Sequence, residues 1–510
     1  MSSSVKVLSV ICILVLASTI QKISFVNTLP IQSDELYSLA RTCNFSIYPK
    51  AIDFSLDLNK AYRLDDLLRV FRPKFDNGNF FTDSFFYLKN FFRLSNHPPI
   101  ADVLSKITIF DREVNIIHLR YLSCLYFLLT LIVLYLVYRR LGSNKETSVW
   151  ALVIFSSLSL VSLTASFPKS YALQILVCIT AFLYYLKATS QPKLINHILS
   201  LVLFHLAFLV HYFSVLILPA WYLFIDFQKQ KTNKWRSIFY TLSLIIYWPI
   251  VSLQRQHTSD YFHEQYTLIK ELKYFWRLIL NLYGLNFKST LAYLIIVFLL
   301  WCFIKSNDKK SITVYFILSL SPCLALLAYD QIAHSHMIET VRYVLPALPF
   351  VALVLASLAQ SLPIRLIIVA LLLINISIPK IADKKMLNAG IIKGYEKYIQ
   401  EITKNSKSSK VLILVPNYGV KSLILLYELQ AEGLGVKAIE SYNRPVSKQS
   451  FDNKNIFVAS AQSIPDQASL NNFIAKNHIQ KIYILPAWDQ LNPYSKLDLS
   501  NYKLMEIVID

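Results

Sequence analysis

Residues 121–138 read YLSCLYFLLTLIVLYLVY, and no charged side chain interrupts them. Arg139 and Arg140 follow directly. A helix that crosses the hydrocarbon core of a bilayer needs about 20 mostly apolar residues, and this run with the residues just before it reaches that length. The stretch therefore predicts a membrane-spanning helix at 116–138 with a basic end.

The rest of the chain repeats this pattern. The same criterion predicts about eleven spanning helices, near residues 6–26, 116–138, 148–166, 171–187, 194–210, 212–227, 236–253, 287–304, 311–329, 343–360 and 363–380. The first run has an alternative interpretation as a signal peptide. With 55% hydrophobic and only 16% charged residues, the composition is outside that of soluble domains. We therefore predict an α-helical polytopic membrane protein.

Basic residues set the predicted orientation, because lysine and arginine in short loops resist translocation. One set of loops carries Lys6, Arg139, Arg140, Lys145, Lys187, Lys193, Lys229, Lys231, Lys234, Arg236, Lys305, Lys309 and Lys310. These loops and the N-terminus are predicted to be cytoplasmic. The alternate connections are then external, including the long segments 27–115 and 254–286 and the tail that follows the last helix.

The tail differs in character from the rest of the chain. It has apolar, strand-like runs at 411–415, 456–458 and 482–485, and a helical stretch at 421–430. Strands that alternate with helices are typical of an α/β domain. We therefore predict a transmembrane domain, residues 1–380 with the external loop 27–115, and a small external α/β domain, residues 381–510.

The formal net charge is +20, from 51 Lys and Arg against 31 Asp and Glu. Because the charged residues lie between apolar runs, we expect membrane lipids and lipid phosphates as partners, and not nucleic acid. The 6 cysteines show no disulfide or zinc spacing. His334 and His336 suggest a metal site, but no third ligand is identifiable. We expect no required cofactor; a divalent cation is possible in principle, but no ligand cluster supports one.

Two adjacent carboxylates, Asp34 and Glu35, follow the first predicted helix on the external side. Charge this close to a bilayer is costly and points to a function. A carboxylate at the membrane surface can act as a general base that takes the proton of an acceptor as it attacks a sugar. Asp34 is the first candidate for this role, and a helix cap or a solvated pair is the alternative.

His97 lies in the same external loop, directly before Pro98 and Pro99. The two prolines fix the local backbone, so the imidazole has a defined direction. It could bind a phosphate, an acceptor or a metal, and a purely structural role is the alternative.

Two further external positions carry a cation. Lys169 lies in a very short turn between two predicted spans, and Arg342 precedes Tyr343 at the start of a late helix. A lysine offers a point charge to a lipid phosphate, and an arginine offers a planar fork of donors. A lysine that only reaches for water and an ordinary Arg-Tyr interfacial anchor are the alternatives.

Five motifs occur in a characteristic order: Asp34-Glu35, His97-Pro98-Pro99, Arg120-Tyr121-Leu122, Lys169-Ser170-Tyr171-Ala172-Leu173 and Arg342-Tyr343-Val344-Leu345-Pro346. In this order they resemble the dolichyl-phosphate-mannose protein mannosyltransferase family and its bacterial relatives, including the lipid A aminoarabinose transferases, in the GT-C glycosyltransferase superfamily. The resemblance covers roughly residues 1–380. It implies a GT-C-like fold in the cell membrane (inner or plasma membrane), with the endoplasmic reticulum membrane as the lesser option.

The resemblance also implies an activity: inverting transfer of a sugar from a polyprenyl-phosphate donor to an external acceptor, which is a protein, a lipid or a glycan. Asp34, with Glu35 beside it, is similar to the family's catalytic acid-base position. His97 and Tyr171 would position donor or acceptor, and the lipid phosphate would be held by Lys169, Arg342 and Tyr343. Lysine replaces the family's arginine at 169, and no aromatic residue follows Pro99, so donor or acceptor can differ from those of better-known members.

Two other functions remain open. A transporter or flippase of lipid-linked sugars would also have many spans, but transporters place ionisable groups in mid-membrane. The predicted spans are mostly free of such groups, with His205 and His211 as exceptions. A polymerase or ligase for surface polysaccharide shares the donor class.

Overall fold

The computed structural model describes residues 16, 19–20, 22–23, 26, 60–70, 98, 100–109, 116–167, 170–228, 235–247, 267–285, 290–333, 335, 337–339, 341–359, 364–365, 392–393, 395–416, 420–435, 453–485, 497–498, 503–504 and 508–509. Contacts divide the chain into two compact units, which we call the helical unit (residues 1–26, 88–101 and 120–388) and the sheet unit (residues 27–87, 102–119 and 389–510). Each is described by itself.

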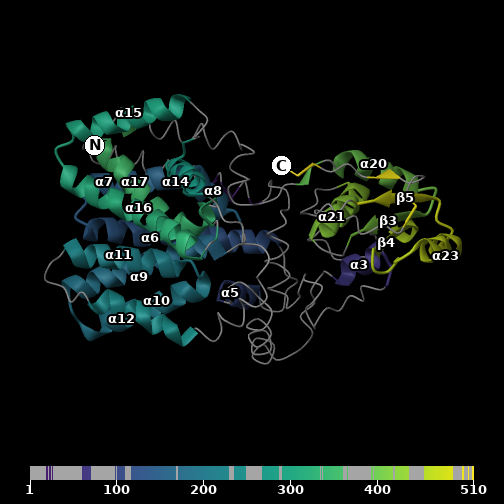
Figure 1. Ribbon diagram of the computed structural model, residues 1–510, viewed down its shortest axis with the longest axis horizontal. Helices are drawn as coiled ribbons and strands as arrows, with labels where there is room; N and C mark the ends of the chain where they lie inside the picture. Colours follow the sequence, from purple (N-terminus) through teal and green to yellow (C-terminus); the bar gives the residue numbers. More distant parts are fainter. Residues whose placement is uncertain are drawn as a thin grey trace. The chain divides into compact units, whose positions relative to one another are not determined.

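The helical unit contains most of the helices (Figure 1). They are α6 (Ile116–Arg140), α7 (Lys145–Ser157), α8 (Ser159–Ala165), α9 (Ser170–Ser190), α10 (Leu194–Val210), α11 (Ser214–Gln228), α12 (Trp235–Ser243), η1 (Leu244–Tyr247), α14 (Leu268–Leu282), α15 (Thr290–Lys305), α16 (Lys309–Ala333), η2 (Met337–Glu339), η3 (Val341–Ala347) and α17 (Leu348–Leu358). Most of α5 (Ile100–Ile109) belongs to the sheet unit. Within the described residues, 4 helices are long and apolar enough to cross a membrane, or up to 5 if α7 and α8 form one bent span. Shorter apolar helices occupy other predicted spans, including α10 and α11. The predicted number of eleven spans stays a prediction.

The span predicted at 148–166 consists of two helices, and this is a difference from the prediction. The axes of α7 and α8 differ by 69°, and Leu158 between them is extended, with φ −70° and ψ 131°. The hydroxyls of Ser156 and Ser157 donate to carbonyls one turn earlier, at 2.8 and 2.9 Å. Serine back-bonding of this kind competes with the helical hydrogen bonds and bends helices.

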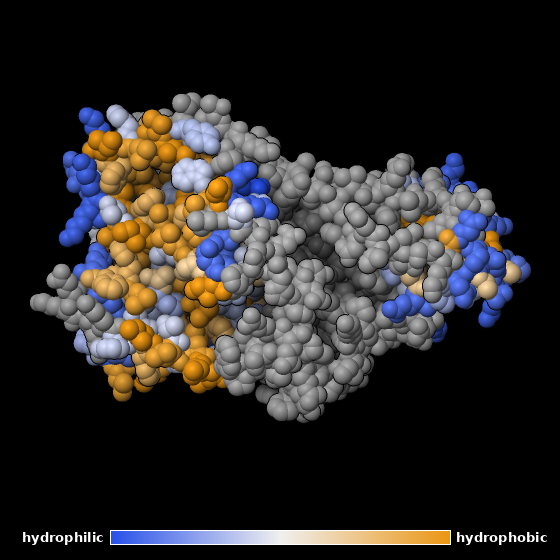
Figure 2. All heavy atoms as spheres, viewed as in Figure 1, coloured by the Kyte–Doolittle hydropathy of each residue, from blue (hydrophilic) through white to orange (hydrophobic). Residues whose placement is uncertain are grey.

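Large aromatic side chains fill the interior of the helical unit. Phe182 of α9, Trp221 of α11 and Phe350 of α17 pack with ring centroids 4.8 to 5.6 Å apart. Trp221 also donates to a carbonyl of α16 at 2.9 Å, and Tyr138 of α6 donates to a carbonyl of α17 at 2.7 Å. On the face shown in Figure 2, the described surface of this unit is largely apolar, with hydrophilic side chains at its edges, as expected of helices whose solvent is lipid.

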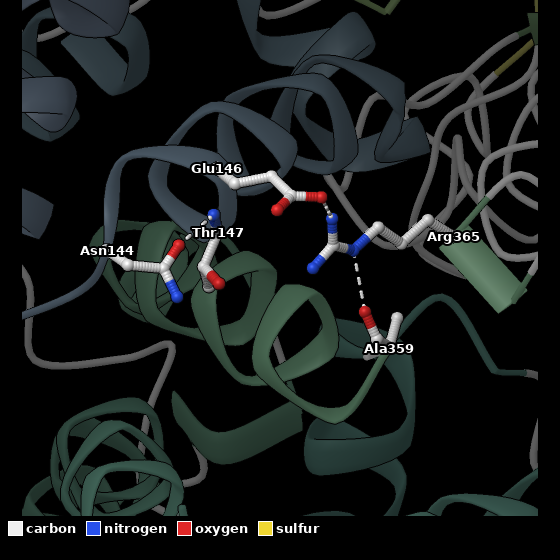
Figure 3. Close-up of polar contacts among 5 residues, drawn as sticks. All are labelled: Asn144, Glu146, Thr147, Ala359 and Arg365. Carbon is white, nitrogen blue, oxygen red and sulfur yellow. Dashed lines mark hydrogen bonds and ion pairs between the residues drawn. The ribbon is translucent and has the colours of Figure 1, made fainter. Parts of the chain in front are cut away.

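A buried arginine joins the start of α7 to the chain that follows α17 (Figure 3). Arg365 Nη1 forms an ion pair with Glu146 Oε1, and Arg365 Nε donates to the Ala359 carbonyl at 2.6 Å. Asn144 caps α7, because its side chain accepts from the Thr147 N–H at 2.8 Å. These contacts lie at the end of the unit that is predicted to face the cytoplasm.

The sheet unit has a five-stranded sheet in the order β1-β4-β3-β5-β6. β3 (Val411–Val415), β4 (Ile456–Ser460), β5 (Lys481–Ile484) and β6 (Lys503–Leu504) run parallel. The other elements are α20 (Tyr395–Ser406), α21 (Val420–Leu434), η4 (Asn453–Asn455), α23 (Gln467–Asn477) and the antiparallel pair β2 (Ile392–Lys393) and β7 (Val508–Ile509). β3 and β4 are buried along their length, as is typical of parallel strands covered on both faces. The α/β character predicted for the tail is present, and its external location stays a prediction.

The fifth strand of this sheet comes from the loop after the first predicted helix. β1 (Tyr62–Arg63) pairs antiparallel with β4, Tyr62 opposite Val458 and Arg63 opposite Phe457. The helix that follows, α3 (Leu64–Val70), buries Leu64 and Leu67 completely. The proposed boundary at residue 380 assigned this segment to the transmembrane domain, whereas here it packs with the C-terminal strands. A two-residue edge strand carries too little pattern to be recognised in sequence.

Candidate functional site

The structure describes three of the seven predicted site residues: Tyr171, Arg342 and Tyr343. Asp34, Glu35, His97 and Lys169 lie outside the described residues, so their predicted roles are untested. Tyr171 is far in sequence from the adjacent pair Arg342 and Tyr343. In the helical unit, the rings of Tyr171 and Tyr343 both lie close to the ring of His211, a residue to which no role was assigned.

Arg342 and Tyr343 lie in η3, where the chain forms a tight 3₁₀ helix before α17. Pro346 disfavours a regular α-helix here, because it has no N–H to donate to the carbonyl of Arg342 and its ring would clash with that carbonyl. Arg342 Nη2 donates to Tyr343 Oη at 3.0 Å, and the guanidinium carbon lies 5.0 Å from the centroid of the same ring. Both side chains are half-buried. The predicted Arg-Tyr pair therefore forms one cationic and aromatic group.

Five rings form a connected group, which we call the aromatic cluster: Tyr171, His211, Phe213, Tyr329 and Tyr343. The His211 ring centroid lies 5.9 Å from that of Tyr171, 5.9 Å from that of Phe213 and 6.1 Å from that of Tyr343. Phe213 stacks on Tyr343 at 4.1 Å and contacts Tyr329 edge-on at 5.9 Å. Such rings offer flat apolar faces with polar tips, which suits contact with a sugar or with an isoprenoid chain.

The cluster assembles because the ends of several helices meet. Tyr171 is in the first turn of α9, Tyr329 is in the last turns of α16, and His211 is in the turn between α10 and α11. His211 is extended, with φ −160°. Its N–H donates to Ala207 and its carbonyl accepts from Ser214, at 3.0 and 2.9 Å. All of these ends are predicted to be external, which is the side predicted for Asp34.

Asp330 organises the connection between α16 and η3. Its side chain is fully buried. One carboxylate oxygen accepts from Ser335 Oγ at 2.5 Å and from the Met337 N–H at 3.0 Å, and the other accepts from the Ile338 N–H at 2.7 Å. A buried carboxylate is stable when several donors surround it. Asp330 thereby fixes the backbone that leads to Arg342.

α14, in the loop predicted to be external, packs against η2 and η3. Burial, and secondly a hydrogen bond to the carboxylate of Glu339, raise the pKa of Tyr274 on this helix. The phenol of Tyr274 therefore stays protonated and donates to η2. This contact supports the same segment from the other side.

Two buried basic side chains hold the end of the first helix, which precedes Asp34 in sequence. Lys22 Nζ donates to the carbonyl of Ser156 at 2.8 Å and lies 4.7 Å from the centroid of the Phe127 ring. Arg120 Nη1 donates to the carbonyl of Val26 at 2.8 Å. The Ser156 carbonyl is available because α7 ends at Ser157. Arg120 belongs to a motif noted in the sequence, and its contact explains why a cation is tolerated there.

No role was predicted for His211, Phe213, Tyr329 or Asp330. Two of them had a signal: His211 is an isolated ionisable residue between apolar runs, and Asp330 is a carboxylate near the end of an apolar helix. Phe213 and Tyr329 had none, because aromatic residues occur throughout this chain. Among the described residues, no group of three His, Cys, Asp or Glu side chains could hold a metal ion.

Comparison with known proteins gives one sequence match and several structural ones. Residues 96–253 match the family model of the dolichyl-phosphate-mannose-protein mannosyltransferases. This segment includes His97, Lys169, Tyr171 and His211, whereas Asp34, Arg342 and Tyr343 lie outside it. No curated protein matches the chain.

The structural matches include two crystal structures of the oligosaccharyltransferase of Archaeoglobus fulgidus. One is a complex with Zn and sulfate, at 12% identity and a TM-score of 0.39, covering 81% of this chain and 61% of that one. The other is tethered with an acceptor peptide, at 11% identity and a TM-score of 0.38, covering 92% of this chain and 68% of that one. The family match confirms the resemblance predicted from the order of the motifs and supports a membrane glycosyltransferase of the GT-C superfamily.

Proposed function

We propose that this chain transfers a sugar from a polyprenyl-phosphate donor to an acceptor on the external face of the membrane, with inversion at the anomeric carbon. The observation that carries the proposal is that Arg342 binds Tyr343 and thereby contacts the aromatic cluster, at helix ends on one side of the helical unit. A lipid-phosphate sugar needs a cation for its phosphate and apolar faces for its sugar and isoprenoid, and these are provided together.

The reaction assigns one step to each predicted residue. Asp34 takes the proton of the acceptor group, whose oxygen or nitrogen forms a bond to the anomeric carbon as the bond from that carbon to the phosphate oxygen breaks. The bonding electrons leave with the polyprenyl phosphate. Arg342 and Lys169 stabilise the negative charge that develops on this phosphate, which lowers the barrier. His97 and Tyr171 position donor and acceptor, and Glu35 lies next to the base.

The distribution of buried charge supports an enzyme over a transporter. Asp226 and Asp330 lie in the last turns of α11 and α16, and Arg120 lies near the start of α6. These described charges are near helix ends, whereas transporters place their coupling groups near the midplane of the bilayer.

The test is sugar transfer in membranes that contain the full chain, with radiolabelled polyprenyl-phosphate sugars and extracted acceptors. We expect Asp34→Asn to bind donor yet lower kcat at least about 100-fold, the usual contribution of a general base. Glu35→Gln is the matched control, and its kcat should fall much less than that of Asp34→Asn. Arg342→Gln should raise the KM for the donor, and the product should have the opposite anomeric configuration to the donor.

Three results would contradict the proposal. Equal kcat for wild type and Asp34→Asn would show that the base lies elsewhere. Movement of labelled lipid between leaflets without transfer would identify a transporter. Growth of a polysaccharide chain as the labelled product would identify a polymerase.

A further inference from the structure

One buried side chain in the helical unit has no described partner for either of its two polar atoms. Gln174 on α9 is fully buried, and neither its Nε2 nor its Oε1 has a hydrogen-bond partner among the described residues. A buried amide without partners is destabilising, because it has lost its hydrogen bonds to water. A glutamine at this position therefore indicates a partner that the described part of the fold does not supply.

The surroundings of Gln174 follow from its neighbours on the same face of α9. Residues three and four apart on a helix share a face. Tyr171, three residues earlier, contacts the ring of His211, and Cys178, four residues later, lies with its Sγ 3.4 Å from Ser214 Oγ. The face that contains Gln174 therefore packs against the turn between α10 and α11. Long side chains on a helix also lean toward its N-terminus, so the amide is directed toward Tyr171 and His211.

We propose that Gln174, together with Tyr171 and His211, forms a subsite that binds hydroxyl groups of the transferred sugar. The proposal rests on the proposed function and names the part of the donor that this side of the cluster recognises. A carboxamide offers two donors and one acceptor oxygen, which matches a sugar hydroxyl that both donates and accepts. A phosphate would leave the acceptor oxygen without a partner, and an isoprenoid chain would leave all three groups without one.

The aromatic cluster extends from this buried subsite to the surface of the helical unit, where a donor can enter. Tyr329 is 38% exposed, Tyr343 and Arg342 are half-buried, and Tyr171 is only 3% exposed. A donor whose phosphate is held at Arg342 can therefore direct its sugar inward, past Tyr343, to His211 and Gln174. In this arrangement Gln174 contributes to sugar specificity and takes no part in proton transfer.

The experiment uses the full chain with Gln174→Leu, a change of similar volume that removes both polar groups. Ser357→Ala is the matched control, since the Ser357 hydroxyl on α17 is also buried without a described partner and lies at the opposite end of the unit. The donor is whichever labelled polyprenyl-phosphate sugar wild type uses, starting with mannose, together with its monodeoxy analogues.

We expect three results together. Gln174→Leu keeps or raises the thermal unfolding midpoint, because an unpartnered amide is removed. It lowers kcat/KM for the parent donor about tenfold or more, the effect of losing a buried hydrogen bond to substrate. For the one deoxy analogue that lacks the contacted hydroxyl, wild type and Gln174→Leu have equal kcat/KM. Ser357→Ala changes neither transfer nor donor discrimination.

Other outcomes overturn the inference. If Gln174→Leu lowers the unfolding midpoint and reduces transfer of every donor equally, the amide has a protein partner and is structural. If kcat/KM is unchanged, or no deoxy analogue abolishes the difference, the amide does not contact the sugar. In both cases transfer by wild type leaves the proposed function standing. If wild type uses no polyprenyl-phosphate sugar at all, the proposed function and the subsite both fail.

Discussion

Arg365 shows how unequal the two ends of one ion pair can be. Its side chain is 6% exposed, whereas that of its partner Glu146 is 64% exposed. The arginine also donates to the Ala359 carbonyl, and its guanidinium lies 5.7 Å from the centroid of the Trp150 ring. We therefore expect the stabilisation from these contacts to depend mainly on the buried arginine, since an exposed carboxylate regains its hydration when the pair breaks.

This asymmetry gives a prediction for two variants. Glu146→Gln should lower the free energy of unfolding by no more than about 1 kcal/mol, the usual limit for a solvated pair. Arg365→Met should cost about 2 kcal/mol or more, because a buried carbonyl loses its donor and the ring loses its cation. Unfolding of the detergent-solubilised chain measures both. An equal loss for the two variants would mean that the ion pair itself dominates.

The candidate site residues show what a sequence can and cannot predict. The order of the motifs was enough to select Tyr171, Arg342 and Tyr343, because each lies at a predicted helix end on the same side of the membrane. That Tyr171 and Tyr343 both contact His211 could not be predicted. Their meeting depends on how α9, η3 and the turn after α10 pack, and no local pattern encodes such long-range contacts.

Among the elements, β5 and α20 are joined by a buried phenol. Tyr483 donates to Glu401 Oε1 at 2.9 Å and accepts from Asn405 Nδ2 at 2.7 Å. Burial first, and then the hydrogen bond to Glu401, raise the pKa of Tyr483 to about 12. The unfolded phenol has a pKa of about 10. The neutral phenol therefore stabilises the fold fully below pH 10, and this stabilisation is lost as the pH rises through 12.

Tyr483→Phe should lower the stability of the sheet unit by about 1 to 2 kcal/mol at pH 8, the net effect of removing hydrogen bonds to partly buried partners. The difference between wild type and variant should shrink between pH 10 and pH 12. Pulse proteolysis of the full chain in urea, with cleavage mapped to residues 389–510, measures it. Glu401→Gln keeps an acceptor but removes the negative charge, so the pKa of Tyr483 should be raised less. The stabilisation by Tyr483 should then be lost at a lower pH than in wild type. A difference that is constant with pH would contradict the assigned pKa.

At the level of elements, the sequence predicted most positions and missed the interruptions. Apolar runs correctly located helices such as α6 and α9 and the strands β3 and β5, because length and periodicity record burial directly. The break at Leu158 was missed, because a run of serines and leucines has the same hydropathy whether it is straight or bent. The 3₁₀ start of the helix at Val341 was missed as well, although Pro346 was a local signal for it.

For the whole molecule, the main consequence is that the C-terminal residues do not complete their own sheet. β1 supplies its edge strand, and α3 covers β4 with Leu64 and Leu67. In sequence this segment lies between Asp34 and His97. The loop predicted to carry the catalytic base is thus fastened at its middle to the C-terminal strands, and both should be needed for activity.

The matching prediction is that residues 389–510 expressed alone are less stable than the same fragment fused to residues 60–70. In the full chain, Leu67→Asp puts an unpaired carboxylate into the core of the sheet unit, which costs several kcal/mol. Cleavage by protease should then increase in residues 389–510 while α9 and α10 stay protected, and sugar transfer should fall. Asp66→Asn, on the exposed side of the same helix, is the control and should change neither. Equal stability of the two fragments would mean that the sheet folds without β1 and that β1 adds no stability to it. The loop could then move independently of the C-terminal strands.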